Sequence, residues 1–160
     1  MEKLALNTEI KAPIARVFDL ARSVDLFQLA QDRKQQVKQL FQENHLLNES
    51  QAISWSAKLA GLKDQFTALI TKMNSPHLIE EQLNFGHFVQ FKHKRFFEEK
   101  EGKTIIRDEF IIDKTAGKLG VAFDLESFKQ QLKKTLKHQY KQLKRYAENE
   151  EQWMQILNIF

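Results

Sequence analysis

Hydrophobic and polar residues alternate at the start of the chain. Leu4, Leu6, Thr8 and Ile10 are separated by small or polar residues, which is the period-two pattern of a β-strand with one buried face. Pro13 follows at a position that the first turn of a helix tolerates, and apolar residues recur after it at helical spacing. The pattern therefore predicts a strand followed by a short helix.

The segment from Asp25 to about Asn44 is polar and rich in glutamine and lysine. Its composition favours a helix, but its few apolar residues do not define one buried face. The segment is therefore helical in propensity but only weakly patterned, and its role stays open.

The middle of the chain predicts a β-hairpin and a further strand. Residues 53–59 and 66–70 alternate between apolar and polar side chains, and Gly61 lies between them. A register that keeps both apolar sets on one face pairs Leu59 with Asp64, Trp55 with Ala68 and Ile53 with Ile70. After a break at residues 74–76, residues 79–85 predict the next strand.

A second hairpin is predicted by residues 87–99 and 103–113. They flank Glu101 and Gly102, a pair of residues typical of two-residue turns. Placing Lys100 opposite Lys103 sets the residues of one face in pairs, namely Phe91 with Ile112, His93 with Phe110, Arg95 with Asp108 and Phe97 with Ile106. A loop longer or shorter by one residue would move one set to the opposite face, so the pattern supports this register.

The chain after Gly117 and Gly120 predicts a long amphipathic helix. Its apolar residues recur every three to four positions, at Leu125, Phe128, Leu132, Leu136, Leu143 and Tyr146. Lysines and Arg145 occupy much of the remainder, which we interpret as a solvated face rather than a membrane or nucleic-acid surface. Because the strands form hairpins and the apolar stripe must be buried, the predicted fold is α+β, with a curved antiparallel sheet wrapped around the C-terminal helix.

Composition narrows the class of protein. The 160 residues fit a single domain, 1–160, without repeats or linkers. The chain has no cysteine and no apolar stretch near the roughly 18 residues of a membrane span, so we expect a cytoplasmic protein without stable membrane insertion. The net charge of +4 decides little, whereas 13 phenylalanines supply apolar surface for a core or for a pocket wall.

The sequence contains no motif of a catalytic or metal centre. Gly-x-Ser-x-Gly, Walker A and HExxH are absent, and the histidines do not have the spacing of metal ligands. We therefore expect no metal and no cofactor, and we favour a function without catalysis.

Several short motifs lie in a recognisable order along the chain. They are Ala12-Pro13, Trp55 with Gly61, Gly86-x-Phe88-x-x-Phe91-x-His93, Gly102-x-Thr104-x-x-x-Asp108 and Gly117-x-x-Gly120. Over nearly its whole length the chain resembles the START-like (SRPBCC) superfamily, in particular bacterial ligand-binding members related to polyketide cyclases and dehydrases. It departs from the family pattern at Arg95, where relatives often carry a second histidine, and at residues 112–114, where they tend to have Tyr-x-x-Pro. The resemblance implies a helix-grip fold whose cavity holds a lipid, sterol, polyketide or other apolar molecule.

The resemblance and the hairpin register together define a candidate ligand site. Its predicted residues are Trp55, Phe66, Phe91, His93, Arg95, Phe97, Ile106, Asp108, Phe110, Leu132 and Leu136. Arg95 and Asp108 are expected to pair, because opposite charges on an apolar face need each other. The pair is either a polar anchor for a ligand or a structural ion pair. Similarly, His93 is either a ligand contact or a satisfied histidine, and the aromatic residues are either cavity lining or packed core.

Three functions fit the sequence. We favour binding, and with it transport or sensing, of a small hydrophobic molecule. The alternatives are an interaction or stress-adaptor protein with a filled cavity, and a cyclase- or dehydrase-type enzyme that uses His93, Asp108 and Arg95. The apolar tail, residues 153–160, predicts either docking within the molecule or a homodimer. Nucleic acid is not an expected partner.

Overall fold

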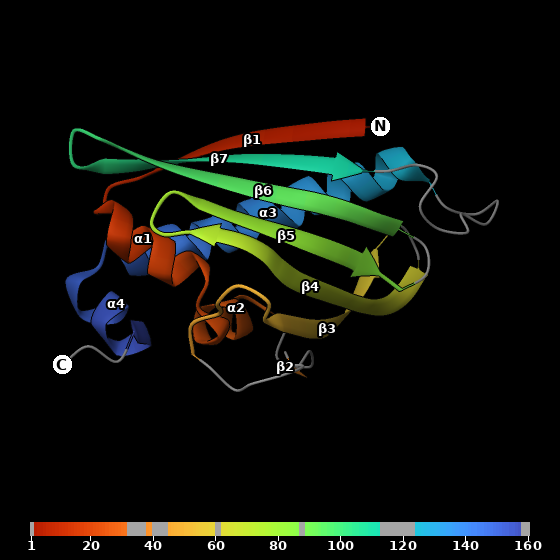
Figure 1. Ribbon diagram of the computed structural model, residues 1–160, viewed down its shortest axis with the longest axis horizontal. Coiled ribbons are helices and arrows are strands. Elements are labelled where there is room, and N and C mark those ends of the chain that lie inside the picture. The colour runs from red at the N-terminus through yellow and green to blue at the C-terminus, as the bar shows by residue number, and fades with distance from the viewer. Residues whose placement is uncertain are drawn as a thin grey trace.

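The computed structural model describes residues 2–31, 38–39, 45–59, 62–86, 89–112 and 124–157. The elements are β1 (Glu2–Ile10), α1 (Ile14–Ala21), α2 (Val24–Ala30), β2 (Lys38–Gln39), β3 (Ala52–Leu59), β4 (Leu62–Asn74), β5 (Leu78–Phe85), β6 (Val89–Lys100), β7 (Lys103–Ile112), α3 (Leu125–Ala147) and α4 (Glu150–Leu157). Figure 1 shows the sheet with α3 running along one face, and α1 and α4 together at one end. The motif positions Gly61, Phe88, Gly117 and Gly120 lie outside the described residues.

The described strands form one antiparallel sheet in the order β1-β7-β6-β5-β4-β3-β2. The β6–β7 hairpin has the predicted register, with Lys100 opposite Lys103 and Arg95 opposite Asp108. Its turn residues Glu101 and Gly102 have φ angles of 54° and 77°, as expected for a two-residue turn that matches the twist of the flanking strands. The predicted second hairpin is therefore confirmed residue by residue.

The register predicted for the β3–β4 hairpin was wrong by two residues. Leu59 pairs with Leu62, and Trp55 pairs with Phe66 instead of Ala68. Because side chains alternate along a strand with a period of two, this shift leaves the same side chains on the inner face. The hydrophobic pattern thus determined which face is buried but not how many residues form the loop.

The helical propensity of the segment from residue 25 to about residue 44 is realised only in part. Helix α2 begins after Ser23, whose hydroxyl oxygen accepts a hydrogen bond from the Leu26 amide, and it ends at Ala30. Lys38–Gln39 form the short strand β2, which pairs with β3. Helical propensity is a weak constraint that pairing with a sheet edge overrides. Residues 32–37 and 40–44 lie outside the described residues.

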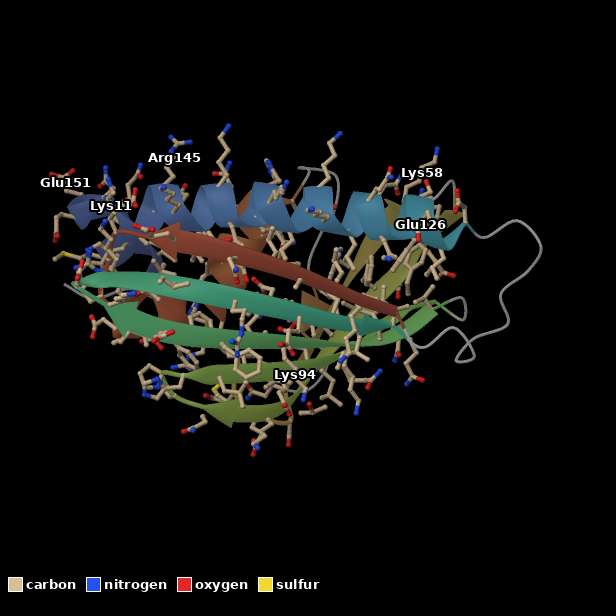
Figure 2. All side chains as sticks on the ribbon, turned by 90° about the horizontal axis from the view of Figure 1, so that it is seen from above. Lys11, Lys58, Lys94, Glu126, Arg145 and Glu151 are labelled. Carbon is tan, nitrogen blue, oxygen red and sulfur yellow. The ribbon has the colours of Figure 1, made fainter. Side chains whose placement is uncertain are left out.

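Helix α3 packs along the inner face of the sheet and buries one stripe of side chains. The stripe consists of Phe128, Leu132, Leu136, Tyr140, Leu143 and Ala147. Most lysines of the helix are exposed, and Figure 2 shows Arg145 pointing away from the sheet. The α+β helix-grip arrangement predicted from the sequence, a curved antiparallel sheet around a long C-terminal helix with short helices after the first strand, is confirmed.

Helix α4 docks within the molecule. Its residues Trp153, Ile156 and Leu157 pack against the core, and the Arg16 guanidinium lies 4.2 Å from the centre of the Trp153 ring. One of the two predictions for the tail is therefore confirmed for residues 150–157, and the homodimer stays a prediction. Within the described ranges, no helix is both long and apolar enough to cross a membrane.

Candidate ligand-binding site

A cavity of about 270 Å³ lies between the inner face of the sheet and helices α2 and α3. Its apolar lining is formed by Leu20, Leu26, Phe27, Leu47, Ile53, Trp55, Phe66, Ala68, Ile70, Leu83, Phe110, Leu132, Leu136 and Leu143. A water molecule occupies ~30 Å³ of the liquid, so the space corresponds to about nine waters. The cavity thus has room for a small organic molecule, and its volume lies just below the range of roughly 300–1,000 Å³ that is typical of ligand pockets.

Small side chains account for part of this space. Ala57 and Ala68 occupy inner positions of β3 and β4 and offer only methyl groups to the cavity. The adjacent inner positions carry large rings, and Trp55 stacks on Phe66 with ring centroids 5.2 Å apart. Phe27 of α2 meets Trp55 edge-on at 4.7 Å. The wall is therefore a packed aromatic surface beside a position where the sheet fills little volume.

Ionisable side chains form the polar part of the site. We call Glu81, His93, Arg95, Asp108 and Tyr140 the polar cluster; they come from β5, β6, β7 and α3. Glu81, His93, Arg95 and Tyr140 line the cavity, whereas Asp108 does not. Asp108 has an exposed fraction of 0% and His93 one of 4%. These charges lie in the interior, where each depends on its partners.

Hydrogen bonds connect the whole polar cluster. Arg95 Nη2 donates to Glu81 Oε1 at 2.7 Å. His93 bridges the two carboxylates, with Nδ1 3.3 Å from Glu81 Oε2 and Nε2 2.6 Å from Asp108 Oδ1. The Tyr140 hydroxyl donates to the same Asp108 oxygen at 2.6 Å. The hydrogen bonds therefore form one continuous network from the strands to α3, in the order Arg95, Glu81, His93, Asp108 and Tyr140.

The predicted ion pair between Arg95 and Asp108 is not what the structure shows. The two residues are opposite each other in the ladder, but the long Arg95 side chain reaches Glu81 on the neighbouring strand and the Ala21 carbonyl at 3.3 Å. Asp108 instead accepts hydrogen bonds from His93 and Tyr140 on Oδ1, and its buried Oδ2 has no partner among the described residues. The strand register determines only that the backbones of Arg95 and Asp108 are opposite each other. The long Arg95 side chain can reach a carboxylate on another strand, so the register does not determine its ionic partner.

The partners of each group shift its pKa in a definite direction. Burial by itself raises the pKa of Glu81, but the Arg95 charge and the His93 hydrogen bond outweigh it and hold this pKa at about 2. Burial lowers the pKa of His93, yet its bonds to Asp108 and Glu81 raise it above its usual value of 6.5. Burial and the charge of Asp108 both raise the pKa of Tyr140 well above 10. Tyr140 is thus a neutral donor at physiological pH.

The geometry around His93 independently favours its protonated form. Both ring nitrogens face carboxylate oxygens, Glu81 Oε2 and Asp108 Oδ1. A neutral imidazole has one donor and one acceptor, so one of its nitrogens would direct a lone pair at a carboxylate. The imidazolium donates at both ends, and it stacks on Phe110 with ring centroids 4.0 Å apart. We therefore assign a positive charge to His93.

The structure separates the predicted site residues into two groups. Those that line the cavity are Trp55, Phe66, His93, Arg95, Phe110, Leu132 and Leu136. Phe91, Phe97, Ile106 and Asp108 do not line it: Phe91 packs among other rings, including Phe128 at 5.6 Å, and Phe97 packs on Phe18 of α1 at 5.1 Å. Phe91 therefore packs against α3 through Phe128, whereas Phe97 packs against α1.

Two members of the polar cluster, Tyr140 and Glu81, were not among the site residues predicted from the sequence. Tyr140 continues the i,i+4 series of Leu132 and Leu136 on the buried stripe of α3. Glu81 lies between Ile79 and Leu83 on the inner side of β5. The helical period identifies Tyr140 and the strand alternation identifies Glu81, so both signals were present in the sequence.

The described residues offer little for metal chemistry or for proton transfer. No group of histidine and carboxylate side chains among them could hold a metal ion. His93 already bonds two carboxylates of the chain. An enzyme that used His93 as acid or base would first have to open one of these bonds.

A curved sheet that grips a long helix, with a partly open cavity between them, defines a START-like, helix-grip fold. Solved structures with this architecture include CV1439 from Chromobacterium violaceum, with a TM-score of 0.68 and 13% identity over 94% of this chain and 100% of that chain. A START superfamily protein from Mycobacterium smegmatis has a TM-score of 0.67 and 11% identity over 91% and 97%. Ginseng major latex-like protein 151 from Panax ginseng has a TM-score of 0.65 and 12% identity over 92% and 98%.

These similarities concern the fold alone, because the identities are low. The sequence matches no protein-family model and no curated protein. The predicted START-like fold is therefore confirmed by structure, and function has to be argued from the site.

Proposed function

We propose that the chain binds a small, largely apolar molecule in the cavity between the sheet and α3. The observation that carries this proposal is the cavity of about 270 Å³ beside an otherwise packed core. Protein interiors leave few voids larger than a water molecule, and an empty apolar void lowers stability. The presence of so large a space supports a role in holding a guest, and the START-like fold supports it further.

The composition of the lining supports a guest with one polar end. Aromatic and aliphatic side chains from β3, β4 and α3 surround most of the space, and the polar cluster contributes Glu81, His93, Arg95 and Tyr140. Sites for small molecules commonly combine an apolar wall with a few fixed polar groups. The open volume also favours binding over the alternative in which the cavity is filled and the chain acts only through its surface.

The fluorescence of Trp55 can report the binding of a ligand in the cavity. The chain has two tryptophans; Trp55 lines the cavity, and Trp153 lies on α4 beneath Arg16. In a Trp153→Phe variant, Trp55 is the only tryptophan, and excitation at long wavelength observes it without the two tyrosines. Titration with a panel of small aromatic and short-chain alcohols, ketones, acids and amines is expected to change its emission saturably. Calorimetry is expected to give one bound molecule per chain.

The reciprocal variant is the control. Trp55→Phe leaves Trp153 as the reporter, and its emission should not respond to the same molecules. The proposal fails if no member of the panel gives saturable binding by calorimetry to the unaltered chain.

A further inference from the structure

The charges of the polar cluster constrain what kind of polar end the cavity accepts. Glu81 and Asp108 are negative, and Arg95 is positive. With His93 protonated, as its two carboxylate partners indicate, two positive groups face two negative groups and the cluster is neutral. If His93 lost its proton, the cluster would carry one net negative charge. In neither state does the cluster offer net positive charge to a ligand.

The other cations of the described lining do not alter this balance. Arg22 donates through Nε and Nη2 to Asp19, at 3.0 and 2.8 Å, and so has a carboxylate of its own. Lys58 is exposed, and Figure 2 shows its side chain on the outside of the molecule. Apart from the exposed Lys58, the cations of the described lining, Arg22, His93 and Arg95, each already have a carboxylate partner.

Arg95 can nevertheless hold an uncharged oxygen. A guanidinium has five N–H donors. Among the described residues, Nη2 donates to Glu81 and Nη1 to the Ala21 carbonyl, which leaves one further N–H on each of these nitrogens, whereas Nε is buried without a protein partner. Donors therefore remain on a residue that lines the cavity, although its charge is already compensated by Glu81. Such a group favours a neutral acceptor over an ion.

We infer that the cavity selects molecules whose polar end is uncharged, such as an alcohol, ketone or amide, and discriminates against carboxylates. The inference rests on the proposed function and names the ligand class of the same site. A carboxylate that leaves water loses strong hydration and gains no net opposite charge here. An uncharged oxygen loses less hydration, and it can still accept a hydrogen bond from Arg95.

Three matched probes test this selectivity in the wild-type chain at pH 7. Phenylbutanol, phenylbutanoate and phenylbutylamine share a ring and a chain and differ in the charge of the end group. By calorimetry, the alcohol is expected to bind about tenfold or more tightly than either ion. Binding of the carboxylate or of the amine as tight as that of the alcohol overturns the inference. Failure of all probes, with failure of the wider panel, counts against the proposed function instead.

A charge-altering variant provides a second, independent test. Glu81→Gln leaves Arg95 without its carboxylate, so the affinity for phenylbutanoate is expected to rise about tenfold relative to the affinity of the same variant for phenylbutanol. The matched control is Glu80→Gln, because Glu80 pairs with Lys94 at 3.4 Å and Figure 2 shows Lys94 on the side of the sheet away from α3. This control should leave the ranking of the probes unchanged.

A thermal melt establishes whether Glu81→Gln is folded. In the folded variant, an unchanged preference for the alcohol overturns the charge-balance argument. If the single variant does not fold, the double variant Glu81→Gln with Arg95→Gln removes both charges together. It is expected to keep the wild-type order of the probes, and a preference for the carboxylate would contradict the inference. The wild-type ranking decides the question in either case.

Discussion

Tyr140 and Asp108 show what a charge needs in order to remain inside this core. Asp108 has no exposed surface, and Tyr140 supplies one of the two hydrogen bonds to its Oδ1. Tyr140→Phe removes the hydroxyl and leaves the ring in place. Because a buried carboxylate then loses a donor, we expect the free energy of unfolding to fall by about 1–3 kcal/mol in urea denaturation.

Tyr146 on the same helix is the matched control. Its side chain is only partly buried, so Tyr146→Phe should change the free energy of unfolding by less than about 0.5 kcal/mol. Equal effects of the two substitutions would show that the hydrogen bond from Tyr140 to Asp108 does not contribute to the free energy of unfolding.

Glu81 makes the stability of the protein depend on pH in the acid range. Its pKa is about 2 in the folded chain and 4.5 ordinarily, so folding favours the ionised form. The resulting stabilisation is present above pH 4.5 and is lost as the pH falls through about 2. A difference of this size corresponds to about 3 kcal/mol. The difference in unfolding free energy between wild type and Glu81→Gln should therefore shrink between about pH 5 and about pH 2.

His93 has the opposite sign, because its pKa is raised in the folded chain. Its stabilisation is complete below pH 6.5 and is lost as the pH rises through the raised value. In the acid range examined for Glu81, His93 is protonated in both states, so it does not obscure that measurement. The Glu80→Gln variant, measured in parallel, should show no comparable change. A flat difference for Glu81→Gln would contradict the assignment of Arg95 and His93 as its stabilising partners.

At the level of secondary-structure elements, the short helix α4 depends on the packing of Trp153 against the rest of the molecule. It has eight residues, which is too few for an isolated helix to be stable. Its apolar residues pack against the core, and Trp153 lies under Arg16. Trp153→Ala is expected to lower the free energy of unfolding by about 2 kcal/mol, since a partly buried ring loses its contacts.

Met154 provides the comparison on the neighbouring position. It has an exposed fraction of 38%, so Met154→Ala should cost less than about 0.5 kcal/mol. If both substitutions were neutral in chemical denaturation, α4 would not be docked through Trp153. Light scattering of the same variants would also test the homodimer, which predicts a change of mass when its interface is removed.

The elements that the sequence predicted well share one property, a strict period with a well-defined turn. Glu101 and Gly102 adopt the positive φ angles of a tight turn, so the β6–β7 register followed from residue pattern and turn type together. The β3–β4 hairpin has the same alternation, but Leu59 pairs with Leu62 where a longer loop was expected. The alternation of apolar and polar residues determines which face of a strand is buried. The length and type of the turn determine which residues pair across the hairpin.

At the scale of the whole molecule, the fold was predictable and the site was predictable only in part. The long apolar stripe of α3 requires a sheet to cover it, which leads to the α+β arrangement. A cavity is a small difference between the volume enclosed by the elements and the volume of their side chains, and no local pattern encodes it. The partner of Arg95 likewise depends on a third strand, since Glu81 lies on β5 and Asp108 on β7.

Stability and binding make opposite demands on this interior. An empty cavity forfeits contacts that a larger side chain would supply, so filling it should stabilise the fold while removing the proposed function. Ala68 is buried on β4 and lines the cavity. In Ala68→Phe, the added ring would occupy the space next to Phe66. We expect an unchanged or higher melting temperature and at least about a tenfold loss of affinity for phenylbutanol.

The control places the same ring where no cavity exists. Ala5 is exposed on β1, so Ala5→Phe should alter neither the melting temperature nor the affinity appreciably. Ala68→Leu adds less volume and is expected to give an intermediate loss of binding, which separates gradual filling from overpacking. If Ala68→Phe were fully stable and still bound phenylbutanol like the wild type, the ligand would have to lie elsewhere. A stable fold that loses binding in step with the added volume would identify the cavity as the part of this interior that is kept for function.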